Sequence, residues 1–394
     1  MRWLCALLAG TLLLAGCSDD DPGAPDAGQG ATASNIATEL ETAVDEQHEA
    51  AGDDLDTLRA VIVAQHGEIV LERYYDGAGP DDYWDVASVT KSILGTLVGI
   101  AVADGDIPGL DATLGDLLPE YRSDMTPALA GATLEQLLTM TAGTAGTFDH
   151  SDDAWVTSPE PIETILTTAT GTPGEHFAYS NGGTHLIGAV LERATGTELV
   201  PYAREKLFDP LDVDTRPAYE PLPLEENVDE FDAADFAWWT DKQGLNAGSC
   251  CIKLRPRDLV SIGTLYLDGG AWEGEQLVPE GWVRESTTTQ VDTRGYAAAD
   301  NGYGYLWWTG ELDGHPSYLA WGFGGQAIRV VPDQDLVVVL ASALPSGPTD
   351  QGVPYYAGLF LTDEIIAPLL VDQPRDEAAG RHRSRAATLR PCGC

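Results

Sequence analysis

The sequence contains few basic residues. Its 394 residues include 21 lysines and arginines against 63 aspartates and glutamates, which gives a formal net charge of −42 at pH 7. Proteins that bind nucleic acids need a basic surface that displaces the counterions of the phosphates, and this chain has little basic surface to offer. We therefore expect no nucleic-acid partner and an acidic, self-repelling surface with little attraction to anionic lipids.

The sequence also lacks the short motifs of several enzyme classes. It has no G-x-S-x-G, the nucleophile turn of the α/β-hydrolases, and its seven histidines form no H-E-x-x-H zinc motif. It has no G-x-x-x-x-G-K-[ST] loop to hold nucleotide phosphates. We therefore expect neither a metal nor a cofactor.

Cysteine is scarce as well, and its six residues fall into close groups. They are Cys5, Cys17, Cys250, Cys251, Cys392 and Cys394. They are too few and too clustered for a disulfide framework. The adjacent Cys250 and Cys251 are predicted to be a small buried pair on a strand, although an exported protein could oxidise them.

The first 17 residues have the pattern of an export signal. Arg2 precedes an apolar run, Trp3 to Ala15, that is too short to span a bilayer comfortably. Its end, Leu-Ala-Gly-Cys17, resembles the lipobox of bacterial lipoproteins. The resemblance implies cleavage before Cys17, lipidation of its thiol, and a cell-envelope protein that faces the periplasm or exterior. The alternative is a plain secretory signal with an incidental cysteine.

Two further segments are predicted to lie outside the folded body. Residues 18–35 are rich in Asp, Gly, Pro and Ala and are expected to form a flexible acidic linker. Residues 372–394 form a basic tail that ends in Cys-Gly-Cys. This end admits a metal or redox role, but we favour a disordered tail.

The body, residues 36–371, has strand patterns towards both ends and helix patterns in between. Runs of β-branched residues joined by His66-Gly67 predict a hairpin, and apolar periodicity predicts helices. Helices are expected at 36–51, 88–104, 134–140, 161–168, 184–194, 256–267, 279–286 and 355–370, and strands at 58–65, 68–74, 250–254, 304–309, 317–321, 327–331 and 336–341.

This order of elements predicts an α/β (α+β) domain. A sheet built from both ends of the body, about 36–103 and 245–371, is interrupted by a mainly helical lobe at about 104–244. The seam between two such parts is a common place for a pocket.

Ser88-Val89-Thr90-Lys91 opens the helix predicted at 88–104. Three residues apart on a helix, the Ser88 and Lys91 side chains share one face and can touch. A serine hydroxyl becomes a nucleophile when a nearby base takes its proton, and a buried lysine can be that base. The helix start also directs the Ser88 N–H at a developing oxyanion. The alternative is an N-cap at Ser88 with Lys91 on the surface.

Tyr179-Ser180-Asn181 lies in a loop, 173–183, that is bracketed by proline and glycine and leads into the next helix. The phenol of Tyr179 could move a proton to a leaving group, and the amide of Asn181 could hold the lysine and the substrate. The alternative is that Tyr179 is a core aromatic residue.

Ser88-x-x-Lys91, Tyr179-x-Asn181 and a later glycine-rich strand together resemble the three motifs of the penicillin-recognising serine hydrolases. The likeness is greatest to the class C β-lactamase-related group, which includes D-alanyl-D-alanine carboxypeptidases, family VIII esterases and aminohexanoate-dimer hydrolases. It runs from about residue 36 to 370 and includes the stretches 137–143, 173–183, 257–259 and 265–270. It implies a serine β-lactamase/transpeptidase-like antiparallel sheet flanked by helices, and a covalent acyl-enzyme on Ser88.

The third motif departs from the family pattern, in which a Lys-Thr-Gly or His-x-Gly strand helps to bind a substrate carboxylate. Here residues 321–326 read Trp-Gly-Phe-Gly-Gly-Gln. The resemblance implies Phe323 at the Lys/His position, Gly325 at the glycine position and the Gln326 N–H as second oxyanion donor. Because an aromatic ring cannot pair with a carboxylate, we expect an esterase or amidase rather than a dedicated β-lactamase.

The sequence thus predicts an exported serine hydrolase that acts on a small-molecule ester or amide through Ser88, with Lys91 and Tyr179 moving protons. The expected substrate-binding residues are Asn181, Phe323, Gly325 and Gln326, and the expected membrane contact is the lipid on Cys17 alone. The alternative is a non-catalytic binding module on the cell surface that keeps the same fold.

Overall fold

The computed structural model describes residues 33–146, 154–216, 228–293, 301–344 and 358–371. The predicted signal peptide with Cys17, the linker up to residue 32 and the tail at 372–394 lie outside these residues. Among the residues described, no helix is both long enough and apolar enough to cross a bilayer.

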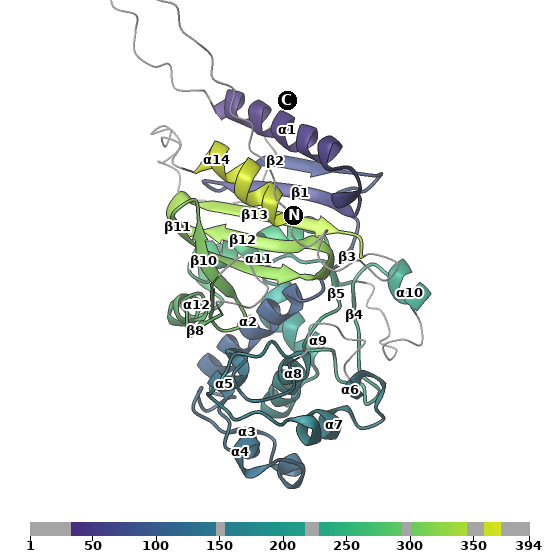
Figure 1. Cartoon of the computed structure of the whole chain (residues 1–394), viewed down its shortest axis with the longest axis vertical. Helices are drawn as coiled ribbons and strands as arrows, with labels where there is room; N and C mark the ends of the chain where they lie inside the picture. Colours follow the sequence, from purple (N-terminus) through teal and green to yellow (C-terminus); the bar gives the residue numbers. More distant parts are fainter. Residues whose placement is uncertain (1–32, 147–153, 217–227, 294–300, 345–357, 372–394) are drawn as a thin grey trace, which may run out of the picture.

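One antiparallel sheet of eight strands forms the centre of the molecule, in the order β2-β1-β13-β12-β11-β10-β9-β8 (Figure 1). The two ends of the body meet in it, because β1 pairs with β13 from Leu58 opposite Ser342 to Gln65 opposite Leu336. The strands are β1 (Leu58–Gln65), β2 (Glu68–Tyr74), β8 (Val291–Asp292), β9 (Gly302–Tyr303), β10 (Trp308–Leu312), β11 (His315–Gly322), β12 (Gln326–Val331) and β13 (Leu336–Ser342).

Helices cover both faces of this sheet, so its central strands are buried and apolar on both sides. Helix α11 (Pro256–Leu267) covers one face, and α1 (Ala33–Ala51) with α14 (Ala367–Leu370) covers the other (Figure 1). Helix α11 approaches closely because Gly263 has no side chain. A Cβ there would lie 2.5 Å from a Val337 methyl and 2.9 Å from an Ile328 methyl.

A mainly helical lobe lies below the sheet in Figure 1. Its helix α8 packs against α2, which runs between the lobe and the sheet, and also against α5 and α7. A small sheet in the order β3-β5-β4 borders the start of α2. The remaining elements are α2 (Val89–Asp104), α3 (Leu114–Leu117), α4 (Pro127–Ala130), α5 (Leu134–Leu138), α6 (Ala154–Thr157), α7 (Pro161–Thr168), α8 (Asn181–Thr195), α9 (Leu199–Ala203), α10 (Val228–Ala233), α12 (Glu280–Ser286), β3 (Trp84–Asp85), β4 (Ala237–Trp238), β5 (Ile252–Leu254), β6 (Ala271–Trp272) and β7 (Glu275–Gln276).

Most predicted elements of the body are confirmed, and β1, β2, α7 and α11 have the predicted bounds. The strand predicted at 250–254 is corrected, because Cys250 and Cys251 form a disulfide and β5 begins at Ile252. The strand predicted at 304–309 is interrupted by a turn in which Leu306 has φ 62°. The closing helix is confirmed from residue 358 onwards, with a π-helical stretch before α14, and residues 355–357 lie outside the description.

Candidate active site

A tight turn places Ser88 at the start of α2. Ala87 has φ 46°, a left-handed conformation that is uncommon for a residue with a Cβ. The Asp85 carboxylate accepts the Ala87 N–H at 2.8 Å and so supports the turn. Ser88 occupies the N-cap position, but its side chain makes no capping hydrogen bond to the helix. The predicted alternative is therefore confirmed for the N-cap position of Ser88, but its hydroxyl does not cap the helix.

Lys91 lies one turn further along α2 and is buried, with 1% of its surface exposed. Its Nζ donates to Ser88 Oγ at 3.0 Å and to Asn181 Oδ1 at 2.8 Å. It also donates to the main-chain carbonyl of Ser249 at 2.6 Å. These three oxygens satisfy a buried cationic or amine nitrogen, and the alternative of a surface lysine is wrong.

Tyr179 and Asn181 reach Lys91 from the start of α8. The Ser180 hydroxyl caps this helix by accepting the Gly183 N–H at 3.0 Å, which fixes the residues on either side of it. The Lys91 Nζ lies 4.8 Å from the centre of the Tyr179 ring, and this ring stacks on Trp308 at 5.9 Å. The structure thus brings Ser88, Tyr179 and Asn181 together around one lysine.

A glycine, Gly322 at the end of β11, lies against Ser88. A Cβ on Gly322 would lie 2.6 Å from the Val86 carbonyl oxygen and 3.1 Å from the Ser88 nitrogen, so only glycine fits. The predicted glycine, Gly325, lies three residues later, with its carbonyl oxygen facing Gly358. The predicted placement of the third motif is therefore corrected by three residues.

This correction also changes the positions of the other two residues predicted on that strand relative to the motif glycine. Gln326 pairs with Gly322 across the β11–β12 hairpin, and its side-chain amide bonds the main chain of Ser342 at 2.6 and 3.1 Å. Phe323 follows Gly322 and is 39% exposed. The position two residues before Gly322 holds the buried Ala320, so it carries no cation either.

Several buried residues on the segments that surround α2 and the start of α8 have left-handed backbone conformations although they are not glycine. They are Ala87 (φ 46°), Met140 (φ 59°), Cys251 (φ 76°) and Leu306 (φ 62°). Met140 accepts the Ser180 N–H on its sulfur at 3.4 Å, and the Leu306 carbonyl accepts the Ser92 hydroxyl at 2.7 Å. Such conformations persist where the surrounding structure over-determines them, which is a common property of active sites.

Two charged residues, Asp85 and Lys253, lie next to the turn that leads into Ser88. Burial raises the pKa of Asp85 to about 7, although the Ala87 N–H and Lys253 act in the opposite direction. Burial also lowers the pKa of Lys253, which donates to the carbonyls of Phe231 and Asp232 at 3.0 and 2.7 Å. Nothing in the sequence singled out these two residues, because neither belongs to a motif.

Sequence reasoning also missed the Ser249 carbonyl and Gly322. A main-chain carbonyl is present in every residue, so the residue type of Ser249 gave no signal. Gly322 is one of several glycines in the stretch 322–325, and their spacing alone left the register open. Within the described part of the chain, no group of histidine, cysteine and acidic side chains could hold a metal ion.

Comparisons with known proteins show the family and the fold of this chain. A family model described as Beta-lactamase matches residues 47–362. The chain is 28% identical over 386 residues to the 6-aminohexanoate-dimer hydrolase of Paenarthrobacter ureafaciens, which covers 91% of this chain and 90% of the relative. It is 25% identical to penicillin-binding protein 4 of Amycolatopsis lactamdurans, over 66% of this chain and 72% of the relative. The octameric penicillin-binding protein homologue from Pyrococcus abyssi has a similar fold, with a TM-score of 0.63 at 18% identity over 84% of this chain and 77% of that one.

Proposed function

Because the chain belongs to the Beta-lactamase family of serine hydrolases and has its antiparallel sheet flanked by helices, we propose that it cleaves ester or amide bonds through an acyl-enzyme on Ser88. One observation carries the proposal above all. The Lys91 Nζ lies 3.0 Å from Ser88 Oγ, while Asn181 Oδ1 and the Ser249 carbonyl accept hydrogen bonds from it and hold it in place. A base in hydrogen-bond contact with a serine hydroxyl is the arrangement that nucleophilic catalysis requires.

The proposed reaction begins when Ser88 Oγ attacks the substrate carbonyl carbon and its proton passes to the amine form of Lys91. The tetrahedral oxyanion accepts hydrogen bonds from the Ser88 N–H at the positive end of α2. The second donor is the N–H of the peptide that follows Gly322, because Gly322 abuts the Ser88 nitrogen. Tyr179 relays the proton to the leaving group, and water then hydrolyses the ester on Ser88.

The proposed substrate is an ester or amide that lacks a carboxylate at the third-motif position. Ala320 and Phe323 cannot pair with an anion, and the net charge of −42 repels anionic molecules. Aromatic rings line the region behind Tyr179, where Trp308 contacts Phe177 at 6.0 Å and Trp321 at 6.2 Å between ring centres. An esterase or amidase therefore fits better than a dedicated β-lactamase, and the similarity to a 6-aminohexanoate-dimer hydrolase supports a hydrolase of this kind.

A fluorophosphonate probe tests this proposal, because it reacts with an activated serine. We expect the folded protein to be labelled, Ser88→Ala to be unlabelled, and the matched control Ser261→Ala to be labelled at the parental rate. Ser261 lies on α11, and its hydroxyl donates to the Arg257 carbonyl of the same helix. Absence of labelling in the folded parent would favour the non-catalytic binding module instead.

We also propose that the protein is exported and lipid-anchored at Cys17. The support is the sequence alone, in which the apolar run to Ala15 ends in Gly16-Cys17. Cells fed an alkyne-bearing palmitate analogue should incorporate it into the parent and not into Cys17→Ser. No incorporation into either protein would leave only the plain secretory signal, and equal incorporation into both would place the lipid on another residue.

A further inference from the structure

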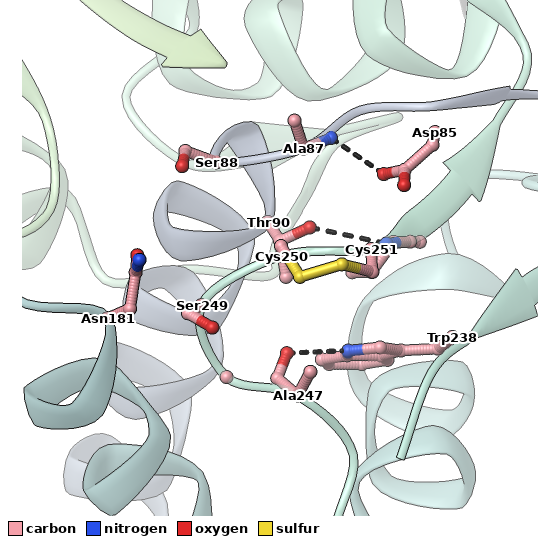
Figure 2. Close-up of a disulfide and its surroundings, with 12 residues drawn as sticks. Asp85, Ala87, Ser88, Thr90, Asn181, Trp238, Ala247, Ser249, Cys250 and Cys251 are labelled. Atoms are coloured by element: carbon pink, nitrogen blue, oxygen red, sulfur yellow. Dashed lines mark hydrogen bonds between the residues drawn. A yellow bond between two sulfur atoms is a disulfide. The ribbon is translucent and has the colours of Figure 1, made fainter. Parts of the chain in front are cut away.

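A short segment outside α2 holds the catalytic lysine. This segment, Ser249 to Ile252, is called the strap below, and it crosses the first turn of α2 beside Thr90 (Figure 2). Its first residue accepts the Lys91 Nζ on the Ser249 carbonyl at 2.6 Å. Its last residue, Ile252, donates its N–H to Thr90 Oγ1 at 3.4 Å and accepts the Val86 N–H at 2.9 Å. The strap is therefore bonded to the nucleophile helix and its entry at both ends.

The Cys250–Cys251 disulfide joins the two residues that lie between these contacts. The covalent ring includes the peptide bond between the two cysteines, so it restricts the backbone of both. Cys251 has φ 76°, which residues with a Cβ rarely adopt. Without the ring, Cys251 is free to return to an ordinary φ, and the Ser249 carbonyl then moves relative to Ile252.

A buried pair that the proposed reaction does not use fixes the chain just before the strap. His185 on α8 and Asp241 are both fully buried, with Nε2 3.0 Å from Oδ2. The other ring nitrogen, Nδ1, is 3.3 Å from the Gly248 nitrogen and accepts its N–H. Because Asp241 accepts the Nε2 proton, Nδ1 stays an acceptor. Trp155 stacks on the His185 ring at 4.4 Å and keeps it in this orientation.

We propose that the Cys250–Cys251 disulfide and the His185–Asp241 pair position the catalytic base, by fixing the Ser249 carbonyl so that Lys91 stays against Ser88. This inference rests on the proposed role of Lys91 as the base. Reduction of this disulfide therefore removes one of the supports that hold the catalytic base. A phosphine reductant breaks the S–S bond, two protons from water go to the two thiolates, and the water oxygen goes to phosphorus as phosphine oxide.

The redox part of the proposal is tested on the full chain with tris(2-carboxyethyl)phosphine. We expect reduction to lower kcat for a p-nitrophenyl ester and the rate of fluorophosphonate labelling about tenfold, because small misplacements of a catalytic group cost one to two orders of magnitude. KM should change less than twofold, and reoxidation should restore both rates. Mass spectrometry after thiol alkylation counts the cysteines that were reduced.

Two variants separate this disulfide from other effects. A chain with serine at Cys5, Cys17, Cys392 and Cys394 should respond to the phosphine like the parent. The Cys250→Ser/Cys251→Ser chain reproduces the reduced state even if the buried bond resists the reagent, and it should show the same loss of kcat. Parental kcat in that folded variant, or in the parent with both thiols shown to be alkylated, overturns the role of the disulfide.

The histidine part is tested by a matched pair of substitutions of similar size. In His185→Asn the side-chain oxygen can replace Nδ1 as the acceptor for the Gly248 N–H, whereas His185→Leu offers none. We expect His185→Asn to keep kcat within about threefold and His185→Leu to lose about tenfold at an unchanged KM. Equal rates in the two variants overturn the positioning role. A parent that neither turns over esters nor reacts with fluorophosphonate contradicts the proposed function itself.

Discussion

The centre of the sheet and the start of α2 are buried alike but are held together in different ways. Every residue of β13 is buried, and all but the last are aliphatic. Such packing is non-directional, so a neighbour can shift slightly without losing its contacts. Next to Ser88 the buried Lys91 is polar, and it is fixed by bonds to Asn181 and Ser249 that depend on distance and angle.

This difference indicates a division of roles between the two regions. The sheet contributes free energy of folding, which allows residues such as Ala87 and Cys251 to keep left-handed conformations at the start of α2. A substitution in the sheet should therefore reduce stability and leave the folded enzyme active. A substitution at the start of α2 should reduce activity with a smaller change in stability.

The largest effect is expected from substitution of the buried Lys91, with the buried Lys253 as the control. Lys91→Ala removes the proposed general base, and we expect the rate of fluorophosphonate labelling to fall about a thousandfold. In the control, Lys253→Ala removes bonds to the carbonyls of Phe231 and Asp232, so we expect a lower Tm with kcat within a few-fold. Stopped-flow labelling and thermal unfolding measure the two effects. Parental turnover in Lys91→Ala would remove this residue from the mechanism.

In the sheet, Ile328→Ala should have the opposite effect, a loss of stability with activity unchanged. Ile328 is fully buried between β12 and α11, and its truncation should lower the free energy of unfolding by about 2–5 kcal/mol. Urea unfolding followed by circular dichroism measures this loss. At a temperature where the variant is folded, kcat should match the parent, and a drop of more than fivefold would break the proposed division between the regions.

Gly322→Ala should lower kcat/KM about a hundredfold, because the new methyl group would collide with the Val86 carbonyl and displace the Ser88 N–H. The control is Gly281→Ala on α12, where the nearest atom to the added Cβ is a flexible Arg284 nitrogen at 3.6 Å. That variant should keep parental kinetics. Steady-state ester hydrolysis compares them, and an unchanged rate in Gly322→Ala would contradict the corrected placement of the third motif.

The smallest effect is expected from Asp85 and concerns pH. Its pKa is raised from 3.8 to about 7 in the folded protein, so between these values the folded state holds a proton that the unfolded state has released. The contribution of Asp85 to stability is therefore lost as the pH rises from about 4 to about 7. In Asp85→Asn the free energy of unfolding should depend less on pH, as measured by urea unfolding at a series of pH values. An identical pH dependence in both proteins would mean that another group titrates in this range.

The sequence predicted the elements better than it predicted the contacts between them. Strands β1 and β2 and helix α11 were predictable to the residue because β-branched runs, turn residues and apolar periodicity are local signals. The strand predicted at 250–254 was shortened because the two cysteines are joined to one another, which residue type alone left open. The Gly325 placement failed because consecutive glycines look alike until a neighbour such as Val86 selects one of them.

By itself, the sequence determined the contact between Ser88 and Lys91. Three residues apart at the start of an apolar helix, these side chains share a face by the geometry of the helix alone. The tertiary structure decided what else holds the lysine, because Asn181 and Ser249 lie 90 and 158 residues away along the chain. A main-chain carbonyl or a glycine is the same group wherever it occurs, so packing alone selected the Ser249 carbonyl and Gly322 for the places beside the nucleophile.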